Sequence, residues 1–151
     1  MLPSIIRVEA DEVTYNLHIF LRFEIENMMV ERQVRVAELP ELWNAKMQEF
    51  LGILPAGDAD GVLQDIHWAA GLIGYFPTYS LGNLYAAQLD ETVQEVVGPT
   101  APLIEAGDLA PLLGFMRTRV PQHGNLRDAG PMMADATCQP LDAAPFLAHL
   151  E

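Results

Sequence analysis

A basic and an acidic side chain lie four positions apart near the start of the chain. They are Arg7 and Asp11, within the segment Ile-Arg-Val-Glu-Ala-Asp at residues 6–11. Residues four apart share one face of a helix, so this guanidinium and this carboxylate can pair there. The plain interpretation is a local ion pair at the start of a helix. The alternative is a polar pair that serves a ligand.

A second polar group interrupts apolar sequence at residues 61–68, which read Gly-Val-Leu-Gln-Asp-Ile-His-Trp. If this segment is helical, Gln64, His67 and Trp68 share a face and can form hydrogen bonds to a ligand. Two tyrosines that follow could add a phenol donor: Tyr75 and Tyr79. The alternative is a core histidine that packs among aromatic side chains, which is the usual state of an isolated histidine.

Other kinds of catalytic site lack the residues that they need. No histidine has a second one three to five residues away, and none begins the H-E-x-x-H motif of zinc helices. We therefore expect this chain alone to hold no metal ion. Ser4, Ser80 and Cys138 lie in no nucleophile elbow, and no glycine-rich phosphate loop follows a strand.

The elements that must position these residues are predicted to be helices. Apolar residues recur at helical spacing, and no alternating strand pattern competes with them. Helices are predicted at about residues 9–31, 40–51, 63–67, 81–97 and 109–120, with a last turn at 146–150. Residues 122–145 are rich in Gly, Pro, Asp and Ala, which predicts an irregular connection. We expect one all-α domain over residues 1–151.

The first of these helices is apolar on two sides. Val13, Leu17 and Phe20 recur at helical spacing on one face, and Ile19 and Phe23 mark a second. A helix with two apolar faces needs neighbours on more than one flank. It fits either the interior of a bundle or a surface that receives another chain.

The composition excludes two classes of partner. The 151 residues include 21 Asp and Glu against 8 Lys and Arg, for a formal net charge of −13, so no basic stripe remains for nucleic acid or anionic lipid. The uncharged stretch from Ile66 to Leu89 contains glycines and polar residues that do not suit a lipid-facing helix, so we expect no membrane association. The single cysteine and the lack of a signal-peptide pattern predict a cytoplasmic location.

The two polar segments resemble signature motifs of the thermostable zinc metallocarboxypeptidases of the Taq carboxypeptidase type. The matching positions are Ile6-Arg7-x-x-Ala10-Asp11 and Gly61-x-x-Gln64-Asp65-x-His67-Trp68. Residues 7–18 and 74–85 also read like family sequence. The resemblance implies an all-helical fold, and it covers nearly all of this chain but only about the last third of a family member.

The resemblance also implies roles for individual residues. By this resemblance, Arg7 meets the C-terminal carboxylate of a peptide in a forked pair, and Asp11 orients Arg7. His67 and Tyr79, with Tyr75 as the other candidate, resemble the donors that related peptidases direct at a developing oxyanion. Two further residues would support these side chains from behind: Gln64 and Asp65.

The zinc ligands and general base of the family lie in H-E-x-x-H and a later glutamate motif, upstream of the part that this chain resembles. We therefore expect a truncated, non-catalytic relative without a cofactor that acts as a regulatory or peptide- or protein-binding domain. The alternative is the substrate-binding portion of a working zinc carboxypeptidase, completed by an upstream or partner chain. A third interpretation is a structural remnant whose motif residues only hold the helices together.

The expected partners are a second copy of this chain, a full-length carboxypeptidase of the same family, or peptide C-termini. A helical piece of a larger fold exposes apolar faces, and such faces favour association. The resemblance weakens after Arg119, where family members continue with a His-Gln-His-Gly-like run and this chain has Pro-Gln-His-Gly at residues 121–124. We assign no role to this tail.

Overall fold

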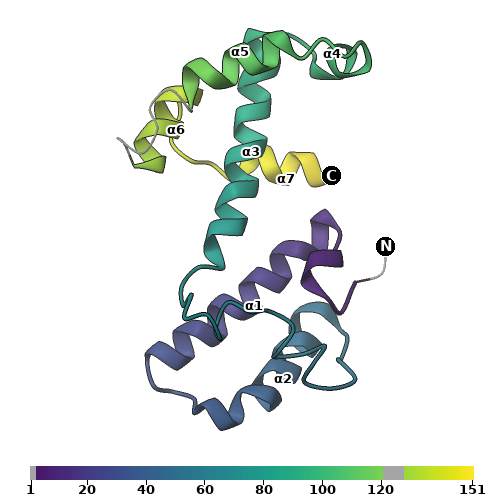
Figure 1. Ribbon diagram of the computed structural model, residues 1–151, viewed down its shortest axis with the longest axis vertical. Coiled ribbons are helices and arrows are strands. Elements are labelled where there is room, and N and C mark those ends of the chain that lie inside the picture. The colour runs from purple at the N-terminus through teal and green to yellow at the C-terminus, as the bar shows by residue number, and fades with distance from the viewer. Residues whose placement is uncertain (1–2, 121–127) are drawn as a thin grey trace. The chain divides into compact units, whose positions relative to one another are not determined.

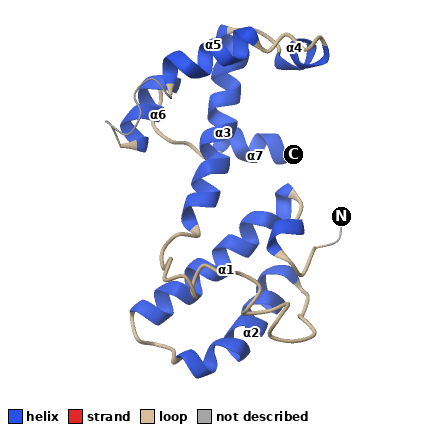
Figure 2. Cartoon of the chain, viewed as in Figure 1, coloured by secondary structure: helices blue, strands red, loops and turns tan. Residues whose placement is uncertain are grey.

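The computed structural model describes residues 3–120 and 128–151, and it contains no strand among them (Figures 1 and 2). The all-helical prediction is therefore confirmed for the described chain. The backbone divides into two compact units, residues 1–80 (unit 1) and residues 81–151 (unit 2). That residues 1–151 form one domain stays a prediction. No described helix combines the length and apolar character needed to cross a bilayer.

Unit 1 is built on two helices that pack against each other, α1 (Glu12–Val30) and α2 (Leu39–Leu51). Short 3-10 turns precede them: η1 (Arg7–Glu9) and η2 (Val36–Glu38). Both predicted helices are confirmed, but α1 begins at Glu12 and not at residue 9. The reason is Asp11, whose extended backbone (φ −71°, ψ 167°) and side-chain cap mark the start of the helix.

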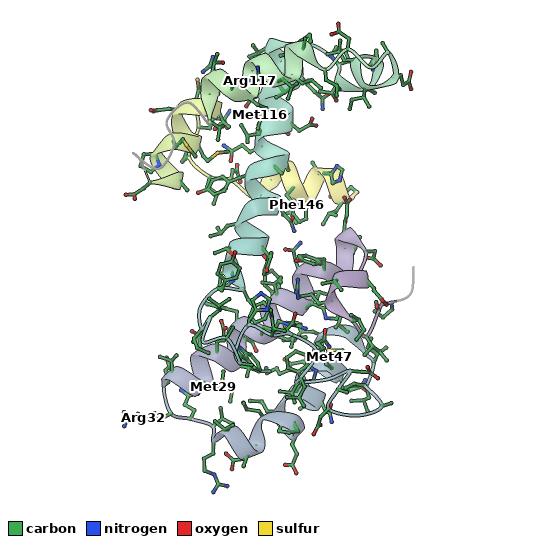
Figure 3. All side chains as sticks on the ribbon, in the orientation of Figure 1. Met29, Arg32, Met47, Met116, Arg117 and Phe146 are labelled. Atoms are coloured by element: carbon green, nitrogen blue, oxygen red, sulfur yellow. The ribbon has the colours of Figure 1, made fainter. Side chains whose placement is uncertain are left out.

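The core of unit 1 lies between these two helices. Leu21 and Ile25 of α1 meet Trp43 and Met47 of α2, and all four side chains are at most 1% exposed. Figure 3 shows Met47 within this layer of side chains, whereas Arg32, just after α1, projects away from the helices. Burial of each large apolar side chain stabilises the fold by about 1.5–3 kcal/mol, so this layer fixes α1 against α2.

A segment without helix, residues 52–76, connects α2 to α3 (Pro77–Val96). The predicted short helix at residues 63–67 is wrong, because the backbone there forms a series of turns. Gln64 N–H, for example, donates to Gly61 O at 3.0 Å. Glycine lowers helix propensity, and the side chains of Gln64 and Asp65 are held by distant arginines instead of lying along a helix.

Unit 2 contains most of α3 and four shorter helices. They are α4 (Thr100–Glu105), α5 (Ala110–Arg119), α6 (Ala129–Thr137) and α7 (Ala144–Leu150). The helices predicted at residues 81–97 and 109–120 and the last turn are confirmed, whereas α4 was not predicted.

The range 122–145 is not irregular throughout, because it contains α6. Asp128 is extended at the start of this helix, and Pro131 lies in its first turn, where a missing N–H removes no helical hydrogen bond. Residues 121–127, including His123, lie outside the described residues. The buried amide of Gln88 on α3 then fixes the chain after α6: its Nε2 donates to Pro140 O at 2.9 Å and its Oε1 accepts from Asp142 N–H at 3.2 Å.

Candidate substrate-binding site

The carboxylate of Asp65 lies between two buried guanidinium groups. Its Oδ1 accepts hydrogen bonds from Nε and Nη2 of Arg7 at 3.2 and 2.7 Å. Its Oδ2 accepts one from Nε of Arg22 at 2.7 Å. Arg7 is 6% exposed and Arg22 is fully buried, so one carboxylate stabilises two charges that have lost most of their water.

Gln64, next to Asp65, ties the same three segments together. Its Oε1 accepts from the backbone N–H of Arg7 at 3.0 Å and from Nη2 of Arg22 at 2.8 Å. Its Nε2 donates to the carbonyls of Ile5 and Asp60 at 3.2 and 2.7 Å. The predicted supporting role of Gln64 and Asp65 therefore has a definite geometry, in which both hold the N-terminal segment and α1 to the turns after α2.

The electrostatics of this cluster favour the charged forms of Arg7 and Asp65. Burial acts to lower the pKa of Arg7, but the hydrogen bonds and charge of Asp65 outweigh burial and raise it. Burial acts to raise the pKa of Asp65, and the two arginines outweigh it and lower the pKa. Arg22 differs, because its complete burial dominates and lowers its pKa to about 10.

Asp11 does not pair with Arg7, so both sequence-based interpretations of this pair need correction. Asp11 Oδ1 accepts from the backbone N–H and the hydroxyl of Thr14 at 2.8 and 3.1 Å, which caps α1. The 3-10 turn that contains Arg7 ends at Glu9, and the backbone is extended at Ala10 and Asp11. The two residues therefore lie on no common helix face, and Asp65 orients Arg7 in place of Asp11.

His67 lies against Tyr79, as the resemblance implied. The Nε2 atom of His67 is 2.9 Å from the Tyr79 hydroxyl, and its ring centroid is 4.4 Å from that of Phe76 and 5.7 Å from that of Tyr75. The buried Nδ1 has no hydrogen-bond partner and lies 3.8 Å from Oδ1 of Asp65. This carboxylate favours the tautomer with the proton on Nδ1, in which the Tyr79 O–H donates to Nε2.

Gln64, His67 and Trp68 do not share one face. Gln64 binds the arginines, His67 meets Tyr79, and Nε1 of Trp68 donates to Oε1 of Glu26 at 2.8 Å. This separation follows from the turns that replace the predicted helix. The alternative of a satisfied core histidine is also incomplete, because one nitrogen of this mostly buried ring has no partner.

Arg7 keeps part of its hydrogen-bonding capacity. Besides its bonds to Asp65, its Nη1 donates to the Tyr15 hydroxyl at 2.9 Å, so three of the five N–H groups of a guanidinium are used and two are left. The group also lies over aromatic rings, with its carbon 5.0 Å from the Tyr79 centroid and 5.7 Å from that of Phe76. Such a guanidinium can accept a carboxylate in a dry, aromatic environment.

The described residues do not fit a zinc ion. Among residues 3–120 and 128–151, no three His, Cys, Asp or Glu side chains lie close enough to hold a metal. Both oxygens of Asp65 are bonded to arginines, and His18 Nε2 lies 3.0 Å from the Ser4 carbonyl. The side chains of this site can therefore bind and orient an anion or a carbonyl oxygen.

Three residues of this cluster were missed in the sequence analysis: Tyr15, Arg22 and Glu26. Arg22 lies four residues after His18 and four before Glu26, so all three form one polar row on the buried side of α1. Polar residues repeated every four positions in an otherwise apolar helix are the signal that could have found them. Their partners in the turn segment are far away in sequence and leave no local pattern.

We predict that replacing Asp65 with Asn destabilises unit 1 by about 3 kcal/mol or more, because two buried guanidiniums lose their compensating charge. Urea unfolding followed by tryptophan fluorescence measures this, since both tryptophans, Trp43 and Trp68, lie in unit 1. Asp60→Asn changes an exposed carboxylate and should stay within about 0.5 kcal/mol of the wild type. Equal losses in the two variants would contradict the role of Asp65.

We also predict that unit 1 loses stability between about pH 6.5 and pH 4. Burial, with the charge of Arg22, lowers the pKa of His18 from 6.5 to about 4. As the pH falls, the unfolded chain therefore binds a proton at His18 before the folded chain does. The free energy of unfolding should decrease over this interval by up to about 3 kcal/mol.

The same fluorescence measurement in His18→Gln should remove most of this pH dependence, because Gln can donate to the Ser4 carbonyl without titrating. His149→Gln changes a histidine on α7 in unit 2 and serves as the control. Below pH 4, protonation of Asp65, whose pKa is lowered in the folded chain, should remove further stability. An unchanged loss between pH 6.5 and 4 in His18→Gln would assign the effect to other groups.

Comparison with known proteins connects this geometry to a family. The model of the carboxypeptidase Taq (M32) metallopeptidase family matches residues 1–151. Thermostable carboxypeptidase 1 of Thermus thermophilus is 46% identical over 149 residues, which are 99% of this chain and 29% of that protein. Carboxypeptidase 1 of Bacillus subtilis is 45% identical over 148 residues, 98% of this chain and 30% of that protein.

Solved structures give the same result. The crystal structure of BsuCP superposes with a TM-score of 0.95 at 44% identity, over 99% of this chain and 30% of that one. Metallocarboxypeptidase 1 of Trypanosoma cruzi gives a TM-score of 0.91 at 39% identity, over 99% of this chain and 32% of that one. The chain thus spans about 30% of the length of these relatives. It belongs to the carboxypeptidase Taq (M32) family of metallopeptidases.

Proposed function

We propose that this chain is a peptide-binding, non-catalytic member of the M32 family that recognises the free C-terminal carboxylate of a peptide through Arg7. The observation that carries the proposal is the state of the Arg7 guanidinium. It is fixed by Asp65 and Tyr15, it remains charged, and two of its N–H groups are left for a ligand. A carboxylate bound there replaces lost water around a positive charge.

His67 and Tyr79 are the proposed contacts of the peptide backbone. In the tautomer that Asp65 favours, the phenol hydrogen of Tyr79 lies on Nε2 of His67. A substrate carbonyl can receive that hydrogen only if it leaves Nε2, so the pair offers a donor that a ligand must win from the histidine. Tyr75, whose ring centroid lies 5.5 Å from that of Tyr79, is the proposed wall beside this donor.

We expect a short peptide with a free C-terminus to bind at least tenfold more tightly than the same peptide with a C-terminal amide, because only the carboxylate forms charge-assisted bonds to Arg7. Isothermal titration calorimetry measures both affinities. In Arg7→Lys, which keeps the charge but loses the fork, the preference for the free acid should decrease. Arg35→Lys, at an exposed arginine of η2's N-terminus, should keep it.

Equal affinity for acid and amide in the wild type would contradict the proposal and favour the structural remnant. In that case Arg7→Lys would change only the unfolding midpoint, measured by tryptophan fluorescence. The remnant interpretation rests on the same contacts, since Arg7 joins the N-terminal segment to Asp65 and Gln64.

The second candidate function is the substrate-binding portion of a working zinc carboxypeptidase, completed by an upstream or partner chain. It is favoured by the length of the relatives, of which this chain spans about 30%. The names of these relatives describe carboxypeptidases, and that activity comes to this chain only as a proposal. A regulatory role and a cytoplasmic location are proposals in the same sense.

Release of C-terminal amino acids from an unblocked peptide separates the two candidates. With zinc or cobalt in excess, we expect the purified chain to release none above a metal-only control, because its described residues form no metal-binding group. Release that copurifies with the chain and is lost in His67→Ala would overturn the non-catalytic proposal. The exposed His149, replaced by Ala, is the matched control for loss of one imidazole.

A further inference from the structure

One side of α1 is apolar and uncovered. Val13, Phe20, Phe23 and Val30 are 46, 46, 45 and 68% exposed. At about 100° per residue these four positions fall within about 100° of the helix circumference, so they form one strip along the helix. We refer to this strip as the outer face of α1.

The outer face is distinct from the sides of α1 that unit 1 already uses. Leu21 and Ile25 pack against α2, and Arg22 lies within the Asp65 cluster. By helical geometry, the row of Arg22 and its neighbours lies about a third of a turn from the centre of the outer face. The sequence pattern of two apolar sides therefore corresponds to one side packed in unit 1 and one side that is bare.

Two half-exposed phenylalanines in adjacent turns are costly to leave in water. A phenylalanine buries about 150–250 Å² when it is covered. Exposed apolar groups that form a contiguous strip, in contrast to scattered ones, mark surfaces that other polypeptides cover. The outer face therefore calls for a neighbour along most of the length of α1.

The size of the relatives and the charge of this chain indicate which neighbour. The relatives that it matches over almost its whole length are about three times as long, so in them the same fold is joined to a further body of polypeptide. A second copy is a poor occupant, because each copy carries a net charge of −13 and the two would repel. We propose that the outer face of α1 is the docking surface for the part of an M32 carboxypeptidase that this chain does not span.

This inference rests on the proposed role of unit 1 as one wall of a peptide-binding groove, and it names the partner of that wall. The docking side and the Arg7 side of α1 are different, so an assembly measured without peptide tests the docking alone. Failure of docking with intact carboxylate preference would leave the proposed function standing, and the reverse result would leave the docking standing.

The test co-expresses the complete 151-residue chain with a tagged segment of Bacillus subtilis carboxypeptidase 1, namely the roughly 70% that this chain does not match. The amount of soluble chain recovered with the tagged segment is the readout. We expect the double variant Phe20→Ser/Phe23→Ser to reduce it about tenfold or more, and Val30→Ser to reduce it less. Val36→Ser removes an apolar side chain that is 77% exposed on η2 and should leave it unchanged.

All of these positions are exposed, so the variants should keep the wild-type tryptophan fluorescence and unfolding midpoint, which are measured alongside. Equal recovery with the wild type and the double variant, or no recovery with either, overturns the proposal. Sedimentation of the wild-type chain alone gives the remaining outcome. A dimer that becomes a monomer in the double variant assigns the outer face to a second copy and also overturns it.

Discussion

The fold of unit 1 depends on one carboxylate, Asp65, that is shared by two buried guanidiniums. A buried charge without a partner costs several kcal/mol, which exceeds the contribution of any single apolar side chain in the core. Arg22 can enter the interior only when the turn segment delivers Asp65 and Gln64 to α1. The same requirement fixes the N-terminal segment, because Arg7 completes the cluster.

The two arginines divide the work of this cluster. Arg22 is fully buried, lies over Trp43 and donates to Asp65, Gln64 and the carbonyl of His18, so it serves the fold. Arg7 shares the carboxylate but borders Tyr15, Phe76 and Tyr79, and it retains donors. A binding residue thus takes its orientation from a neighbour that no ligand needs to reach. The two sequence motifs are halves of this one arrangement.

The sequence was sufficient where local rules decide the structure. Helical spacing bounded by Pro40, Gly52 and Gly98 predicted α2 and α3 closely, and the motifs identified Arg7, Asp65 and His67 as neighbours of one site. It failed where distant partners decide. The turns at residues 63–67 replace a helix because side chains there bind arginines from elsewhere in the chain.

Asp11 and Arg22 show the same limit from the other direction. Four-residue spacing favoured an Arg7–Asp11 pair, but capping of α1 takes the carboxylate of Asp11. Arg22 resembled an ordinary exposed residue of a helix, and only its partner 43 positions later makes it interior. Contacts of this kind carry no periodicity and cannot be derived from one sequence.

The distances along the chain within the Asp65 cluster also set an order of events during synthesis. Asp65 follows Arg22 by 43 residues and Arg7 by 58. Until Asp65 leaves the ribosome, a nascent α1 carries a guanidinium that it cannot bury on one side and two uncovered phenylalanines on another. Closure of such long loops is late and slow compared with helix formation. A nascent chain of this protein therefore passes through a stage in which its first helix is formed, unpaired and open to molecular chaperones.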